Sequence, residues 1–101
     1  MGTHLWTWGG TYFGQRDGDS LWTCKGRHVG RFHDDEVYGR DGKYLGEIKS
    51  DNRLITNKSK RSRRHGSFTP YGSRGSSRYG NCGGYGMYAG YEDFPDPESF
   101  H

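Results

Sequence analysis

A block of about ten residues recurs at an interval of sixteen residues in the first half of the chain. Its copies start at Leu5, Leu21 and Val37, and each copy has a glycine at its centre and another at its end. A weaker copy at 53–57 keeps an apolar pair and a Thr but lacks the glycines. Because one small unit cannot bury its own apolar face, recurring units are expected to pack around a shared interior.

Each block is typical of a β-hairpin, because a short turn sequence lies between two runs rich in aromatic and β-branched residues. The turn sequences are Gly9-Gly10, Lys25-Gly26 and Asp41-Gly42. A two-residue turn that ends in Gly favours the primed turn types, whose twist matches that of the strands. Such turns predict three core pairs on facing strands: Trp6 with Phe13, Trp22 with Val29, and Tyr38 with Leu45.

The last glycine of each block has a separate predicted role. We expect Gly14, Gly30 and Gly46 to lie opposite Leu5, Leu21 and Val37, respectively. A missing side chain at these positions leaves room for a neighbouring hairpin or accommodates a bulge.

Composition restricts the fold class further. Only 29% of the residues belong to the apolar set AVILMFWYC, and 18 of the 101 are glycine. So little aliphatic material excludes a helical bundle and a deep enzymatic α/β core. We therefore predict an all-β fold, in which residues 1–57 form a small pseudo-symmetric assembly of three to four β-hairpins. A Gly/Tyr/Arg-rich C-terminal tail follows, with a flexible segment at 58–90 and an acidic, aromatic segment at 91–101.

The glycine-centred blocks resemble a known family. Trp-Gly-Gly (8–10), Lys-Gly-Arg-His-Val-Gly (25–30) and Val-Tyr-Gly-Arg-Asp-Gly-Lys-Tyr-Leu-Gly (37–46) are similar to the four-fold beta flower domain, a bacterial family of hairpins around a pseudo-four-fold axis. The resemblance covers roughly residues 4–57 and implies this fold, without an established activity or catalytic residues. It leaves open whether residues 53–66 or a later segment completes the fourth hairpin.

Charge is concentrated in the middle of the chain, although the net charge is only +3. Residues 49–80 hold nine Lys and Arg against one acidic residue, whereas residues 81–101 hold four acidic residues and no Lys or Arg. The aromatic end of the chain, with Tyr88, Tyr91, Phe94 and Phe100, is expected to dock either on the domain's own apolar surface or on a partner.

The basic segment is a candidate nucleic-acid-binding site, because cations attract phosphates and interleaved tyrosines stack on single-stranded bases. The residues concerned are Lys58, Lys60, Arg61, Arg63, Arg64, Arg74 and Arg78. The simpler interpretation is a solvated linker whose charge aids solubility.

A candidate interaction face follows from strand alternation. Tyr12, His28 and Tyr44 occupy corresponding positions in the three blocks and project to the same side. They either form a surface for a peptide or a second copy of the chain, or they belong to a second packing layer.

No arrangement typical of catalysis, metal binding or cofactor binding is present in the sequence. The five histidines are scattered, and none is paired with Cys24 or Cys82 at zinc-ligand spacing. The acidic runs 17–19 and 34–36 are explained equally well as solvated turns, because they lack EF-hand spacing. We expect Cys24 to be an ordinary strand residue, Cys82 to be an exposed thiol, and the two not to form a disulfide.

These observations predict a non-catalytic module with a structural or protein-interaction role, and the alternative is a nucleic-acid-binding accessory protein that uses the basic tail. A protein partner or self-association is expected, whereas a cofactor, a small-molecule substrate and a membrane are not. The absence of a long apolar run and of a signal-peptide pattern favours a cytoplasmic location.

Overall fold

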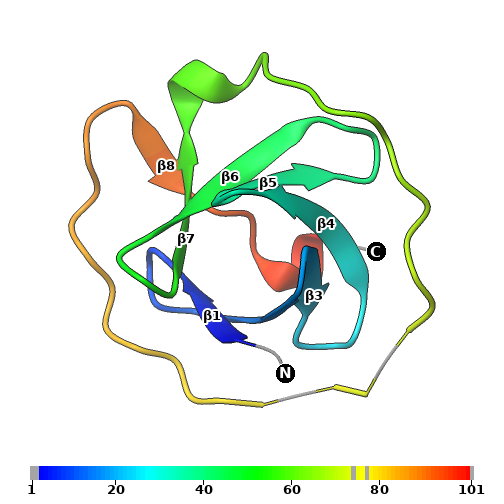
Figure 1. Ribbon diagram of the computed structural model, residues 1–101. Coiled ribbons are helices and arrows are strands. Elements are labelled where there is room, and N and C mark those ends of the chain that lie inside the picture. The colour runs from blue at the N-terminus through cyan, green and yellow to red at the C-terminus, as the bar shows by residue number, and fades with distance from the viewer. Residues whose placement is uncertain (1–2, 74, 77, 101) are drawn as a thin grey trace.

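The computed structural model describes residues 3–73, 75–76 and 78–100, and its main element is a single β-sheet (Figure 1). Neighbouring strands in the chain are neighbours in the sheet throughout, in the order β1 to β8. The strands are β1 (Thr3–Thr7), β2 (Tyr12–Asp17), β3 (Ser20–Thr23), β4 (His28–His33), β5 (Glu36–Gly39), β6 (Tyr44–Lys49), β7 (Arg53–Asn57) and β8 (Tyr91–Asp93).

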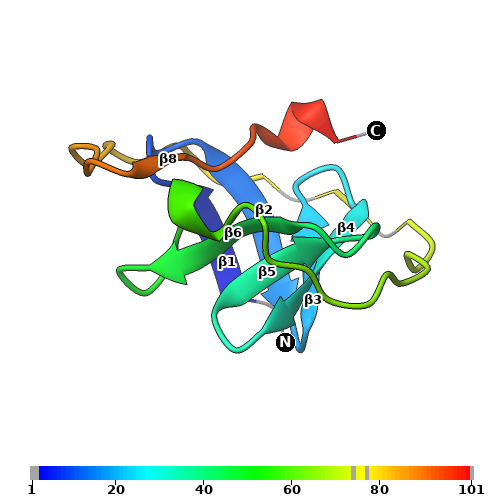
Figure 2. The same ribbon diagram turned by 90° about the horizontal axis from the view of Figure 1, so that it is seen from above.

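The sheet closes into a barrel. Strand β7 pairs in parallel with β1, placing Trp6 opposite Arg53 and Thr7 opposite Leu54, so β1 to β7 form a closed ring. Strand β8 is an additional strand on β7. Closure leaves few unpaired strand edges, which suits a chain with too little apolar material for a second layer of helices. Figure 2 shows a flat molecule, and its principal dimensions are 36 × 32 × 22 Å.

The loops within the first three hairpins are one residue longer than predicted. The Thr7 N–H donates to the carbonyl of Thr11 at 2.8 Å, and the same bond joins Thr23 to Arg27 and Gly39 to Lys43. Three residues therefore lie in each loop, and the third is Gly10, Gly26 or Gly42 with φ of +97°, +83° or +85°. This geometry is a tight turn followed by a left-handed residue, a position that glycine occupies without strain.

The longer loop changes the register, so the predicted pairs were wrong. Trp6 lies opposite Tyr12, Trp22 opposite His28, and Tyr38 opposite Tyr44, rather than opposite Phe13, Val29 and Leu45. A register shift then lets Leu5, Leu21 and Val37 face Gly14, Gly30 and Gly46, which confirms the role expected of these glycines. A Cβ on Gly30 would lie 2.6 Å from Val37 Cγ2, so the bulge has no room for a side chain.

The main apolar cluster contains Phe13 but not Trp22 or Tyr38, although both of these residues are buried as predicted, at 7% and 2% exposed. Its buried members are Leu5, Phe13, Leu21, Phe32, Val37, Leu54 and Phe94, with Val29, Leu45, Ile48 and Phe100 packed against them. Trp6, Trp22 and Tyr38 lie outside this cluster and pack against rings of the tail.

The fourth hairpin is completed by the later of the two segments that the sequence left open. Strand β8 runs antiparallel to β7, with Ile55 opposite Asp93 and Asn57 opposite Tyr91. Phe94, directly after β8, is 3% exposed and packs edge to face on Phe13 at 5.2 Å. The C-terminal segment therefore docks on the domain itself.

The described part of 58–90 runs around the rim of the molecule and connects β7 to β8 (Figure 1). It contacts the first and third hairpin loops in the same manner. The Cys82 N–H donates to the Gly10 carbonyl at 2.8 Å, and the His65 N–H donates to the Gly42 carbonyl at 2.9 Å. We call this segment the rim segment; its flexibility stays a prediction.

The described residues contain two helical turns, the three-residue 3-10 helices η1 (Lys58–Lys60) and η2 (Pro97–Ser99). Within the described part of the chain, neither is long or apolar enough to cross a membrane.

Candidate binding cavity

The three rings predicted as an interaction face are buried in the structure. Tyr12, His28 and Tyr44 are 5%, 5% and 6% exposed. The ring of Tyr79 covers Tyr12 at 5.4 Å, and that of Tyr71 stacks on His28 at 4.7 Å. Their burial fits the alternative interpretation, a second packing layer, and the rim segment lies over Tyr12 and His28.

Both ring nitrogens of His28 are used in hydrogen bonds within the protein. Its Nδ1 accepts from the Tyr71 N–H at 2.9 Å, so Nδ1 carries no proton, and Nε2–H donates to the Gly30 carbonyl at 3.0 Å. Burial lowers the pKa of this imidazole, and the nearby positive charge of Arg31 acts in the same direction. His28 is thus a neutral residue that fixes the rim segment on the second hairpin.

We expect the unfolding free energy of the protein to decrease as the pH falls below about 6.5, the ordinary value for the imidazole. The folded-state pKa of His28 lies below that value, so the unfolded chain binds a proton first and is stabilised relative to the folded form. Urea unfolding at several pH values between 8 and about 5 measures this slope. A His28→Gln variant is expected to show a shallower slope, and an unchanged slope would contradict the role assigned to His28.

The basic run is largely engaged with the protein's own carboxylates. Lys60 Nζ lies 2.7 Å from Glu36 Oε2 and 2.8 Å from Glu47 Oε1, bridging two residues that face each other on β5 and β6. Arg63 lies 3.2 Å from Glu36, and Arg61 pairs with Glu92.

The other predicted phosphate-binding residues are Lys58, Arg64, Arg78 and Arg74. The first three are exposed, and no ion pair joins them to a residue that the structure describes. Arg74 lies outside the described residues. The structure therefore divides the predicted nucleic-acid site: Lys60, Arg61 and Arg63 hold the rim segment in place, and three cations face solvent.

The ion pairs of Lys60 also affect the titration of the cluster. Hydrogen bonding to Lys60 lowers the pKa of Glu36, and the two carboxylates raise the pKa of Lys60. Burial raises the pKa of Tyr38, whose hydroxyl donates to Glu36 Oε1 at 2.8 Å. Each charge here has an opposite charge or a donor beside it, so the cluster is a structural clamp between the rim segment and the third hairpin.

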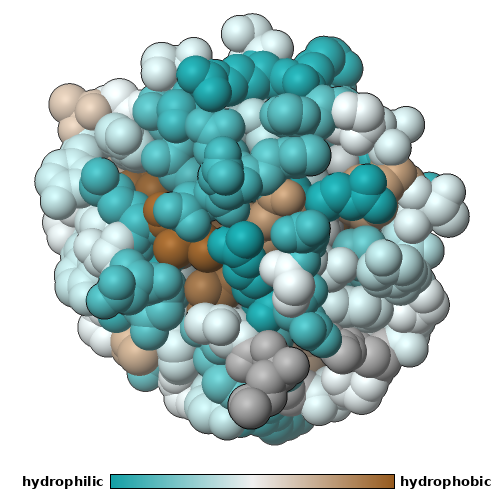
Figure 3. Space-filling view, viewed as in Figure 1, coloured by the Kyte–Doolittle hydropathy of each residue, from teal (hydrophilic) through white to brown (hydrophobic). Residues whose placement is uncertain are grey.

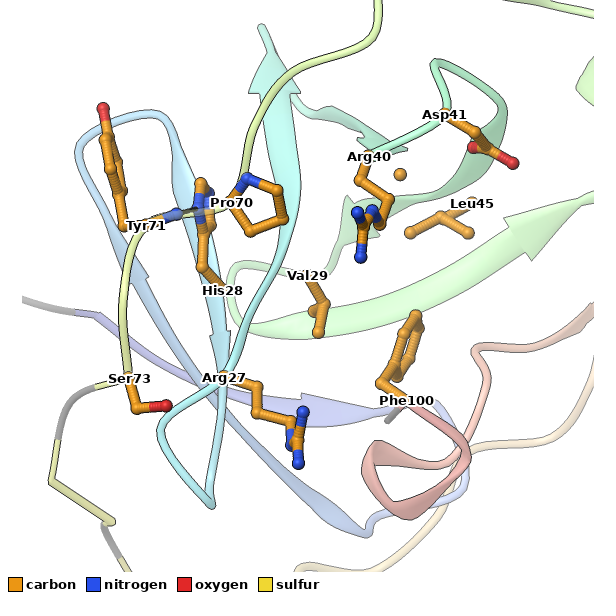
Figure 4. Close-up of a pocket in the computed structure, with 11 residues that line it drawn as sticks. Arg27, His28, Val29, Arg40, Asp41, Leu45, Pro70, Tyr71, Ser73 and Phe100 are labelled. Carbon is orange, nitrogen blue, oxygen red and sulfur yellow. Dashed lines mark hydrogen bonds between the residues drawn. The ribbon is translucent and has the colours of Figure 1, made fainter.

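A cavity of about 310 Å³ opens between the second and third hairpins, and we call it the inter-hairpin cavity (Figure 4). Its apolar lining comes from Val29 on β4, Leu45 on β6 and Phe100 from the C-terminal segment. Its charged lining comes mainly from Arg27 and Arg40, which belong to the loop regions of the two hairpins. Figure 4 shows Val29 between the two arginines in this view, with the ring of Phe100 beside them.

The cavity walls are held by local interactions. The Lys25 ammonium lies 3.5 Å from a carboxylate oxygen of Glu98, which ties the C-terminal segment to the second hairpin. Asp96 caps η2 by accepting from the Glu98 N–H at 2.9 Å. Asp41 is also in the lining, and its Oδ1 accepts from the Lys43 N–H at 3.1 Å within its own loop.

The lining is suited to an anion with an apolar body. Arg27 and Arg40 are exposed, and neither forms an ion pair with a described residue. A guanidinium keeps its charge at all physiological pH values and presents several N–H donors in a fixed fork that matches a carboxylate. The surface seen in Figure 3 is mainly hydrophilic with a small hydrophobic area left of its centre, so that face offers no broad apolar surface.

Sequence reasoning singled out His28 of this lining but missed Arg27 and Arg40, because the cavity is formed by two different hairpins and the chain end. The 16-residue interval gave a weak signal, since Arg40 replaces Cys24 at the corresponding loop position. Cys24 and Cys82 are both free thiols, the first half-buried and the second exposed. In the described part of the chain, no three His, Cys, Asp or Glu side chains are grouped as metal ligands.

Comparison with known proteins adds one finding about the chain. A family model described as "4-fold beta flower protein" matches residues 1–79. The match extends past Asn57 into the rim segment but does not reach β8. No curated protein and no solved structure matches the chain.

Proposed function

The chain belongs to the 4-fold beta flower family, and from this premise we propose that it is a non-catalytic protein-interaction module. The inter-hairpin cavity is the site where a segment of the partner binds. The observation that carries the proposal is the pair of guanidiniums, Arg27 and Arg40, without ionic partners among the described residues beside an apolar floor. Such groups orient a ligand by charge, while the apolar floor supplies the contact area.

The chemistry of the lining supports binding rather than catalysis. A guanidinium stays protonated at neutral pH, so Arg27 and Arg40 are unsuited to general acid or base roles. His28 is the imidazole in the lining, and the Tyr71 N–H and the Gly30 carbonyl already bond both of its nitrogens. A cavity of about 310 Å³ accommodates one or two residues of a peptide, which is typical of a weak and transient contact.

An NMR titration of the whole chain with a mixture of short peptides that have free termini tests the proposal. We expect amide shift changes at Arg27 to Val29, at Arg40, at Leu45 and near Phe100. A Val29→Phe variant fills part of the floor and is expected to weaken these changes while the melting temperature stays within a few degrees. Shift changes confined to other surfaces, or none at millimolar peptide, would contradict the proposal.

Nucleic-acid binding by the rim segment is the alternative. Lys58, Arg64 and Arg78 face solvent, and the rings of Tyr71 and Tyr79 are 61% and 53% exposed. Three cations give weak affinity for phosphates, which should decrease steeply between about 50 and 200 mM salt. A gel-shift series with nucleic acid compares the protein with a variant in which Lys58, Arg64 and Arg78 are all replaced by Met. Loss of nucleic-acid binding in the variant would favour this alternative over binding at the cavity.

A further inference from the structure

We propose that the inter-hairpin cavity recognises the free C-terminus of a polypeptide that ends in a bulky apolar residue such as Phe or Leu. This inference rests on the proposed function and names the partner's chemistry. The α-carboxylate of the last residue binds between Arg27 and Arg40, and its side chain lies on Val29, Leu45 and Phe100.

A ligand of this cavity must match two features that lie close together, the positive charge and the apolar lining. The charged lining favours an anion, because Arg27 and Arg40 both line the cavity and neither forms an ion pair with a described residue. The apolar lining requires a hydrocarbon group directly beside that anion. Asp41 is the one acidic residue among the described residues of the lining, so the positive charges of the two arginines exceed its negative charge. Its carboxylate also accepts a hydrogen bond from the Lys43 N–H in its own loop.

A C-terminal apolar residue meets both requirements with one residue, whereas an internal residue does not. An internal Asp or Glu provides a carboxylate without an adjoining apolar side chain, and an internal Phe or Leu lacks the charge. Capture of a terminal carboxylate is an established mode of peptide recognition in proteins. The cavity has a small volume, about 310 Å³. It therefore favours the end of a chain over an internal segment, whose backbone must both enter and leave the cavity.

The partial exposure of the site limits its affinity. Val29, Leu45 and Phe100 are half-buried, and both arginines are exposed. For about fifteen ligand atoms, a contact of this kind corresponds to a Kd of about 0.1–1 mM. Removing one charge-assisted contact is expected to weaken binding about tenfold.

The experiment compares three peptides of equal length on the whole chain, with NMR shift changes at the cavity as the measure. The first ends in Phe with a free carboxylate, the second ends in the amide of the same Phe, and the third is amidated with an internal Glu. We expect the first to bind with the stated Kd and the other two to bind at least about tenfold more weakly. 3-Phenylpropionate is tested as a fourth ligand, because it shows whether the cavity prefers a free organic acid or the end of a peptide chain.

Arg27→Met and Arg40→Met are expected to weaken binding of the first peptide about tenfold. Arg78→Met removes the same charge from the rim segment, outside the cavity lining, and should leave the Kd unchanged. Equal binding of acid and amide at the cavity would overturn the inference while leaving the proposed function in place, and so would binding of 3-phenylpropionate tighter than that of the peptide. No shift change with any peptide would overturn both.

Discussion

A Phe94→Ala variant is expected to lose about 3–5 kcal/mol of unfolding free energy, out of the roughly 5–15 kcal/mol that is usual for a folded domain. Phe94 is 3% exposed and packs on Phe13. It also occupies the space above Gly46, where an added Cβ would lie 2.5 Å from its ring. Gly46 has no side chain with which to fill the space that the truncated residue leaves, so a cavity adds to the lost apolar contact.

Urea unfolding followed by tryptophan fluorescence measures the loss, and Phe100→Ala is the matched control. Phe100 belongs to the same chain segment and contacts the same cluster, but it is only half-buried, so about 1 kcal/mol is expected. Equal losses in the two variants would contradict the assignment of Phe94 to the core of the fourth hairpin. A fragment that ends at Asn57 lacks β8 and Phe94 altogether, and it should show no cooperative unfolding transition.

The hairpins of the fold could be predicted because their signals are local. Glycines at fixed positions mark the backbone conformations that other residues adopt only with strain, so their spacing predicts both the turns and the bulges. The facing residues were predicted one position off, because Trp8, Cys24 and Arg40 belong to the loops rather than to the strands. Loop length sets the register, and a turn of two residues and one of three are hard to distinguish from composition.

The fourth hairpin could not be predicted in the same way. Ile55 and Asp93 pair across the rim segment, which contains no glycine-centred block of the kind seen in the hairpins. Strand β8 is short and partly acidic, so its sequence alone gives little preference for a strand. Its pairing depends on the open edge of β7 and on the burial of Phe94. The family match ends at residue 79, so this completing strand also lies outside the matched residues.

The candidate site depends on contacts between segments that are distant in the sequence. Tyr12, His28 and Tyr44 were predicted to lie on one side of their strands, and the rings of the rim segment cover Tyr12 and His28. The Tyr44 hydroxyl donates to Glu47 at 2.9 Å and accepts from the Asn57 N–H at 3.1 Å. Strand alternation predicts which face a residue occupies, whereas its burial depends on which other segment packs there.

A Lys60→Met variant is expected to lose about 2 kcal/mol of unfolding free energy at pH 7. Glu36 and Glu47 face each other on neighbouring strands, and the Lys60 ammonium lies within 2.8 Å of both carboxylates. Without it, two like charges oppose each other directly and lose their strongest donor. The expected loss is below that of a fully buried ion pair, because the three side chains are 16–23% exposed.

The pH dependence identifies the cause of this loss. The Lys60 ammonium lowers the pKa of Glu36, so its stabilising effect is present above about 4.5 and is lost as the pH falls through the folded-state pKa. In the variant, protonation of one carboxylate relieves the repulsion instead, so the two proteins should differ most near pH 7 and least near pH 4. Urea unfolding of both proteins across this range is the measurement. Lys58→Met removes an exposed charge two residues away and should change little, and a Lys60→Met variant that behaves like it at every pH would refute the clamp.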